Sequence, residues 1–188
     1  MTELNIDFVR SQFPAFRVPE LAEKSFFENA GGSFAAGAVI SRLNRFYTSR
    51  KVQPYASYEA SSLGGQEMDE ARKGLAALLS IAPSTLHFGP STSQNTYVLA
   101  QAFKNMNSKR NVVIVTNQDH EANSGSWRRL ERSGFEIKEW KVNSDTGSLN
   151  VNDLKNLLDE NVLLLAFPHC SNIVGEINPV KEVCKVVR

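Results

Sequence analysis

Short apolar, β-branched runs alternate with amphipathic stretches in the second half of the chain, and this alternation constrains the fold more than any other feature. Four runs are typical of strands, and they cover 85–88, 111–116, 136–142 and 162–167. Helical patterns over 94–104, 127–133 and 151–158 separate them, and Pro179 opens a further helix. This order predicts βαβ units and a mostly parallel sheet. Because the run 162–167 is apolar without alternation, we expect it to be buried on both faces.

The N-terminal half shows a different pattern. We expect helices at 7–12, near 36–50 and through 68–79, a turn at 29–32 and a loop over 53–65. The division predicted from this pattern is an N-terminal helical arm over 1–62 and a partial α/β domain over 63–188. The last helix has no residue typical of a helix C-cap, so we expect the chain to be the front part of a longer protein.

Composition excludes several classes of protein. With 21 Lys and Arg against 20 Asp and Glu, the formal charge is +1, which argues against a nucleic-acid binder. The run 162–167 is far too short to span a bilayer, and the N-terminus shows no secretory signal. Two cysteines make no disulfide framework. We therefore expect a cytoplasmic protein that binds neither membrane nor nucleic acid.

Three polar loops follow predicted strands, at 89–93, 117–123 and 168–172. In parallel α/β sheets, ligands bind at the carboxyl ends of the strands. If the sheet is parallel, all three loops lie at one edge, and we expect them to share one cleft.

Each loop carries side chains with two possible roles. Ser91, Thr92 and Ser93 open a helix, where hydroxyls and N–H groups suit a phosphate, or simply cap the helix. No P-loop or dinucleotide-binding motif is present. His120 is suited to stacking on a planar ligand or relaying protons, or is a solvated loop residue. Asn172 either bonds a ligand or caps a turn.

No metal site is predicted. His169 and Cys170 are adjacent, so they cannot both chelate one metal with ordinary spacing. We interpret Cys170 as a packed thiol and Cys184 as a core residue of the last helix.

Four sequence blocks resemble the class V aminotransferase and cysteine desulfurase family. They cover 27–32, with the sequence FENAGG; 88–95, with FGPSTSQN; 119–127, with DHEAN and a tryptophan; and 171–179, with SNIVGEINP. Their order and spacing also fit. The resemblance implies the three-layer α/β/α large domain of a pyridoxal-phosphate-dependent transferase of the aspartate-aminotransferase-like fold, here incomplete, with an N-terminal helical arm. One departure is Pro90-Ser91-Thr92, where many relatives have T-T-E.

The resemblance also implies roles for individual residues. Ser91, Thr92 and Ser93 hold the phosphate of pyridoxal 5′-phosphate, His120 stacks on its ring, and Asn172 reaches the ring's phenolic oxygen or the substrate carboxylate. The backbone of Asn29, Ala30 and Gly31 approaches the substrate carboxylate.

No catalytic residue of the family is present in this chain. The aspartate that pairs with the pyridine nitrogen and the lysine that binds the cofactor covalently come later in the family. Lys181 and Lys185 fit no such motif. The resemblance therefore implies an enzyme acting on an amino acid, homodimeric when complete and inactive as this chain. The loop 55–58 and the helix near 36–50 are the expected contacts with a partner or with the rest of the protein.

Two alternatives stay open. One is a non-catalytic remnant of the same fold, and the other is a different phosphate- or nucleotide-binding α/β module that uses only the turn at 91–93.

Overall fold

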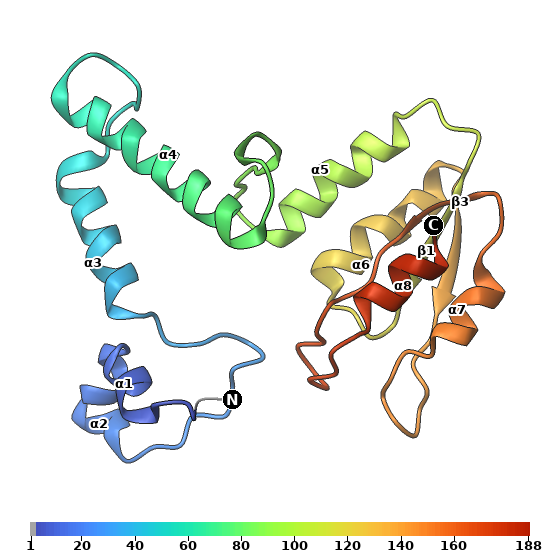
Figure 1. The fold of residues 1–188 in the computed structure, drawn as a ribbon, viewed down its shortest axis with the longest axis horizontal. Helices are drawn as coiled ribbons and strands as arrows, with labels where there is room; N and C mark the ends of the chain where they lie inside the picture. Colours follow the sequence, from blue (N-terminus) through green and yellow to red (C-terminus); the bar gives the residue numbers. More distant parts are fainter. Residues whose placement is uncertain (1–2) are drawn as a thin grey trace. The chain divides into compact units, whose positions relative to one another are not determined.

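The computed structural model describes residues 3–188, and its contacts divide them into two units, one ending at His87 and the next beginning at Phe88 (Figure 1). Each unit is described by itself. The predicted domain boundary after residue 62 falls inside helix α4, Glu59–Leu79, and it stays a prediction about the longer fold. Among residues 3–188, no helix has the length and apolar character needed to cross a bilayer.

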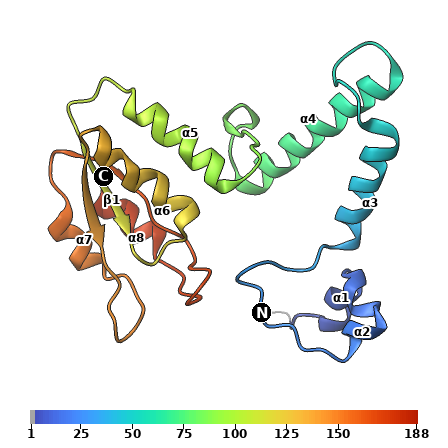
Figure 2. The ribbon, with the colours of Figure 1, turned by 180° about the vertical axis from the view of Figure 1, so that it is seen from behind.

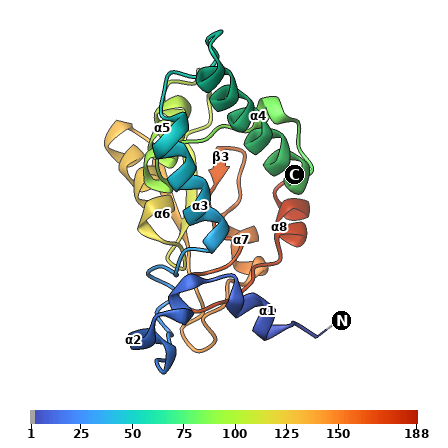
Figure 3. The same cartoon turned by 90° about the vertical axis from the view of Figure 1, so that its left-hand side faces the viewer.

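Within its described residues, the regular elements of the first unit are all helical. Its elements are α1 Ile6–Ser11, a 3₁₀ turn Pro14–Arg17, α2 Pro19–Ala22, α3 Gly37–Arg45, a π-helical turn Phe46–Arg50, α4 and a 3₁₀ turn Pro83–Thr85. The helices predicted at 7–12 and near 36–50 are confirmed. The π-helical turn and the segment 51–58 connect α3 to α4 (Figure 3).

The loop predicted over 53–65 is wrong in its second half, because α4 already begins at Glu59. The glycines at 64 and 65 suggested a loop, but in the fold Gly65 makes room for an aromatic ring. A Cβ atom there would lie 2.6 Å from Cδ1 of Tyr55. Ser61 closes the same turn, since its hydroxyl accepts from the amide of Ala56 (2.7 Å) and donates to the carbonyl of Gln53 (2.5 Å).

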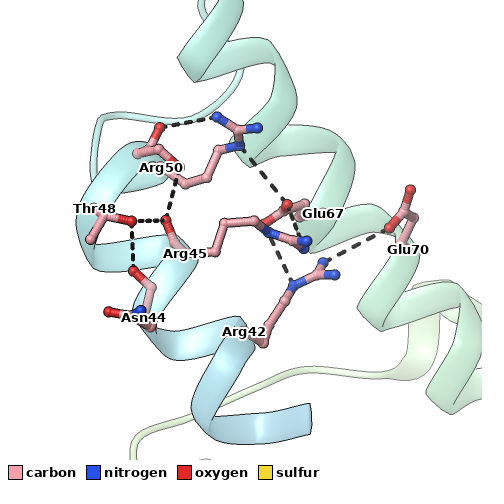
Figure 4. Close-up of polar contacts among 8 residues, drawn as sticks. Arg42, Asn44, Arg45, Thr48, Arg50, Glu67 and Glu70 are labelled. Atoms are coloured by element: carbon pink, nitrogen blue, oxygen red, sulfur yellow. Dashed lines mark hydrogen bonds and ion pairs between the residues drawn. The ribbon is translucent and has the colours of Figure 1, made fainter.

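Three arginines converge on Glu67 and join α3, the π-helical turn and α4 (Figure 4). The carboxylate lies 2.9 Å from Nη2 of Arg45, 3.6 Å from Nε of Arg42 and 3.9 Å from Nε of Arg50. The Glu67 side chain is 22% exposed. This partly buried carboxylate is therefore the shared counter-charge of the three guanidinium groups.

The second unit contains a parallel sheet of three strands, β1 Val112–Thr116, β2 Glu136–Trp140 and β3 Val162–Leu165, in the order β2-β1-β3. Its helices are α5 Thr92–Lys104, α6 Glu121–Arg128 with a 3₁₀ turn Arg129–Ser133, α7 Val151–Leu157 and α8 Val180–Val186. The predicted parallel sheet is confirmed.

The core of this unit has two halves, one on each face of β1. Val113 and Val115 face a cluster that includes Ala100 of α5 and Trp127 of α6. Val112 and Ile114 face the opposite cluster, whose other buried members are Trp140, Leu149, Val151, Leu154 and Val183. Helices α5 and α6 therefore cover one face of the sheet and α7 and α8 the other. Figure 2 shows α6 and α7 on opposite sides of β1. This is the predicted three-layer α/β/α arrangement.

The strand predicted at 85–88 is wrong. Leu86 has extended dihedral angles (φ −100°, ψ 123°), but no strand among the described residues pairs with it. Extended backbone without a neighbour forms no ladder.

The other sequence-based bounds shift by a few residues. β2 ends at Trp140 because Val142 instead forms an antiparallel bridge with Leu149. The loop predicted at 117–123 is shorter, because α6 begins at Glu121.

Candidate functional site

The N-terminus of α5 is the first component of the site. Ser91 is its N-cap, and its hydroxyl accepts from the amide of Gln94 at 3.2 Å. Thr92 and Ser93 belong to the first helical turn, where backbone N–H groups have no partner within the helix. The preceding turn needs Gly89, since a Cβ atom there would overlap the side chain of Asn95. The helix end therefore presents hydroxyl and N–H donors together with the positive end of a dipole.

A groove of about 610 Å³ lies between α5 and α6. It is lined by Ser91, Ser93, Gln94, Tyr97, His120, Glu121, Ala122, Gly125, Ser126 and Arg129. The structure thus brings the turn at 89–93 and the segment after β1 to one cavity, as predicted. Thr92 and Asn172 are not among its lining residues, and neither is any lysine of the described chain.

His120 is the N-cap of α6, a role that the sequence interpretation missed. Its Nδ1 accepts a hydrogen bond from the amide of Ala122 at 2.9 Å. In the neutral imidazole this acceptor role assigns the proton to Nε2. The side chain is therefore held in one orientation, with an N–H donor on the ring atom that the cap does not use.

A chain of side-chain hydrogen bonds runs from the end of β1 into the core, and sequence reasoning missed it as well. Asn123 donates from Nδ2 to Asp119 (2.5 Å) and accepts from the indole N–H of Trp127 (3.2 Å). Burial is the main cause that raises the pKa of the Asp119 carboxyl, partly offset by the bond from Asn123. Asp119, Asn123 and Trp127 are spaced four residues apart, and this spacing could have indicated that their side chains lie on one face of a helix.

The third loop meets the second at a different point. Ser171 is buried, and its hydroxyl lies 3.4 Å from the carbonyl oxygen of Gln118. Asn172 is exposed. The second and third loops follow β1 and β3 at the carboxyl edge of the parallel sheet, and the turn 89–93 shares the groove between α5 and α6 with the second loop. Residues 168–172 do not line that groove. The prediction of one shared cleft is therefore correct for two loops and wrong for the third.

The predicted substrate-contacting residues, Asn29, Ala30 and Gly31, belong to the first unit. The amide of Gly31 donates to the Glu28 carboxylate at 3.1 Å. Asn29 lines a cavity of about 230 Å³ together with Phe13, Phe16, Phe26, Ser33 and Phe34. This turn therefore combines backbone donors with an aromatic wall.

Metal-binding groups are not found in the described part of the chain, where no three His, Cys, Asp or Glu side chains are placed to hold an ion. Cys170 and Cys184 are both free thiols, and Cys170 is exposed rather than packed.

Comparison with known proteins gives consistent matches. The model of the family described as Aminotransferase class-V matches residues 25–188. An aminotransferase-like protein of Gibberella zeae is 33% identical over 99% of this chain and 46% of its own length. A cysteine desulfurase-like protein of Aspergillus flavus is 29% identical over 98% of this chain and 42% of its own length. The chain thus spans somewhat less than half the length of these relatives.

Solved structures show the same fold. The apo structure of a cysteine desulfurase from Thermococcus onnurineus NA1 matches with a TM-score of 0.81 at 23% identity, over 100% of this chain and 45% of that one.

Proposed function

The chain belongs to the class V aminotransferase family, and from this premise we propose that it supplies the phosphate- and ring-binding part of a pyridoxal-phosphate site in an enzyme that acts on an amino acid. The observation that carries the proposal is the groove that unites Ser91, Ser93 and His120.

The donors at the N-terminus of α5 fit a phosphate group. Ser91 and Ser93 line the groove, and the first-turn N–H groups of a 13-residue helix add to them. In this proposal Ser91, Thr92 and Ser93 bind the phosphate oxygens. Arg129 lines the same groove, so a basic side chain is present beside these donors.

His120 and Asn172 are assigned to the cofactor ring. The bond from Ala122 to Nδ1 fixes the imidazole, so that its face is available for stacking. Asn172 is exposed at the same sheet edge and can donate to the ring's phenolic oxygen or to the substrate. Asn29, Ala30 and Gly31 approach the substrate carboxylate through their backbone.

The bound cofactor supplies the electron sink that activates the Cα of an amino acid. Amino transfer and removal of sulfur from cysteine both begin with this activation, and the proposal covers the shared step. Because no lysine of the described residues lines the groove, we propose that the 188-residue chain by itself binds the cofactor without turning over amino acids.

We further propose that the complete protein is a homodimer. Supporting it, α3 and the turn after it expose apolar side chains, namely Val39, Ile40, Leu43, Phe46 and Tyr47. Tyr55 and Tyr58 are exposed on the neighbouring loop. Surfaces of this kind are typical of protein contacts.

Binding of pyridoxal phosphate to the chain tests the cofactor proposal. Titration followed by absorbance should show weak binding that Thr92→Ala and His120→Asn reduce by about tenfold. Asparagine keeps the N-cap of α6 but lacks the ring. Thr85→Ala and His87→Ala change exposed residues outside the groove and are the matched controls.

Borohydride reduction followed by mass spectrometry tests the second part. We expect no single lysine to carry a stoichiometric pyridoxyl group. One such adduct would contradict the assignment of this chain as non-catalytic. Equal affinity of the wild type and both variants would instead favour a non-catalytic remnant, whereas a loss on Thr92→Ala alone would favour a different phosphate-binding module that uses only the turn at 91–93.

A further inference from the structure

Gln118 connects the three loops that follow β1, β2 and β3. Its side chain is 7% exposed and lies just past the end of β1. The amide Nε2 donates to the carbonyl of Gly147 at 2.8 Å, and Oε1 accepts from Nδ2 of Asn178 at 2.7 Å. The carbonyl oxygen of Gln118 lies 3.4 Å from the Ser171 hydroxyl. Gln118, in the segment after β1, therefore contacts the segments that follow β2 and β3.

The partner amide is equally constrained. Asn178 is 3% exposed, and its Nδ2 also donates to the carbonyl of Pro168 at 2.8 Å. Its backbone amide donates to the carbonyl of His169 at 2.8 Å. Because Asn178 is a donor toward Gln118, the orientation of both amide groups is fixed by their partners. Buried amides that share several hydrogen bonds favour one geometry, since an alternative leaves polar groups unpaired.

We infer that Gln118 is a positioning residue that sets the place of Asn172 relative to His120. His120 follows it by two residues along the chain, and Asn172 directly follows Ser171, whose hydroxyl reaches the Gln118 carbonyl. The relevance of these two side chains to a cofactor rests on the proposed function. Neither core cluster includes Gln118, so its loss should displace the loop 168–178 rather than unfold the sheet.

A measurement without cofactor tests the placement directly. A spin label is attached to Ile173→Cys, a 76% exposed position, in a Cys170→Ser, Cys184→Ser background. Paramagnetic broadening of the His120 ring protons then reports how close the loop 168–178 lies to the His120 side chain. Gln118→Met should reduce the broadening, because methionine keeps the length of the side chain and lacks the amide. Gln66→Met, at an exposed position of α4, is the matched control and should leave it unchanged.

The cofactor provides a second measurement on the same variants. Gln118→Met should weaken binding of pyridoxal phosphate about tenfold and alter its induced circular dichroism, while Gln66→Met should change neither. A lower melting temperature with unchanged broadening and affinity would show a merely structural role and overturn the inference. If the wild type binds no pyridoxal phosphate, the proposed function fails, and the broadening still decides whether Gln118 positions the loop.

Discussion

The hydroxyl of Thr96 in α5 donates to the backbone carbonyl oxygen of Ala122 in α6 at 2.5 Å. The same hydroxyl is 2.9 Å from the carbonyl of Thr92, one turn earlier in its own helix. Thr96 is 8% exposed. This contact joins the two helices whose N-terminal ends form the groove, so the width of the groove depends on a polar group within the helix pair.

Thr96→Val should destabilise the second unit by about 1–2 kcal/mol, because it removes a buried hydrogen bond with little change in shape. Thr96→Ser retains the hydroxyl and is the control. Urea unfolding followed by tryptophan fluorescence measures the change, since both tryptophans, Trp127 and Trp140, lie in this unit. Equal free energies of unfolding for Thr96→Val and the wild type would show that the contact makes no net contribution.

Replacing two glycines of α4 with alanine should change the stability of the first unit in opposite directions. Gly65→Ala should destabilise the first unit by about 1–3 kcal/mol, because the new Cβ would meet the ring of Tyr55. Gly74 has open space at the same atom, so Gly74→Ala should stabilise the helix by up to about 1 kcal/mol. Helical circular dichroism during thermal unfolding distinguishes them. A stabilised Gly65→Ala protein would mean that Tyr55 moves aside without cost.

Glu67→Gln should destabilise the first unit by about 1–2 kcal/mol, because Arg42, Arg45 and Arg50 lose their common carboxylate (Figure 4). Glu70→Gln is the control, since that side chain is 71% exposed and should change stability by less than about 0.5 kcal/mol. Unfolding in low and high salt measures both. The difference between the variants should shrink with salt, and a difference that salt leaves unchanged would argue against an electrostatic origin.

The raised pKa of the Asp119 carboxyl should make the free energy of unfolding depend on pH. Burial raises its pKa above the ordinary value of 3.8, so the folded chain binds this proton more tightly than the unfolded chain. Its contribution to stability is therefore present at low pH and decreases as pH rises from 3.8 through the higher folded value. Asp119→Asn keeps an acceptor for Asn123 but does not titrate.

Free energies of unfolding at several pH values test this expectation. Relative to the wild type, Asp119→Asn should gain stability as pH rises through that window, and the gain should level off above it. The opposite slope would show that the bond from Asn123 outweighs the effect of burial.

Sequence patterns were sufficient for much of the second unit. The run at 111–116 carries β-branched residues on both faces, and β1 is the central strand of the sheet. The pattern failed at 85–88, where local propensity for extended backbone was present and a pairing strand was not. It failed again at 59–65, where paired glycines in a helix are explained only by the ring that packs against one of them.

The sequence by itself determined the alternation of elements and the parallel sheet, and its resemblance to a known family implied helices on both faces. The alternation follows from apolar periodicity and helix-start signals, which act between residues close along the chain. Only the tertiary structure decided that His120 caps α6, that Thr96 bonds Ala122, and that Gln118 pairs with Asn178, 60 residues away. Such pairings are single contacts between buried polar groups, and they arise when apolar burial has brought the groups together.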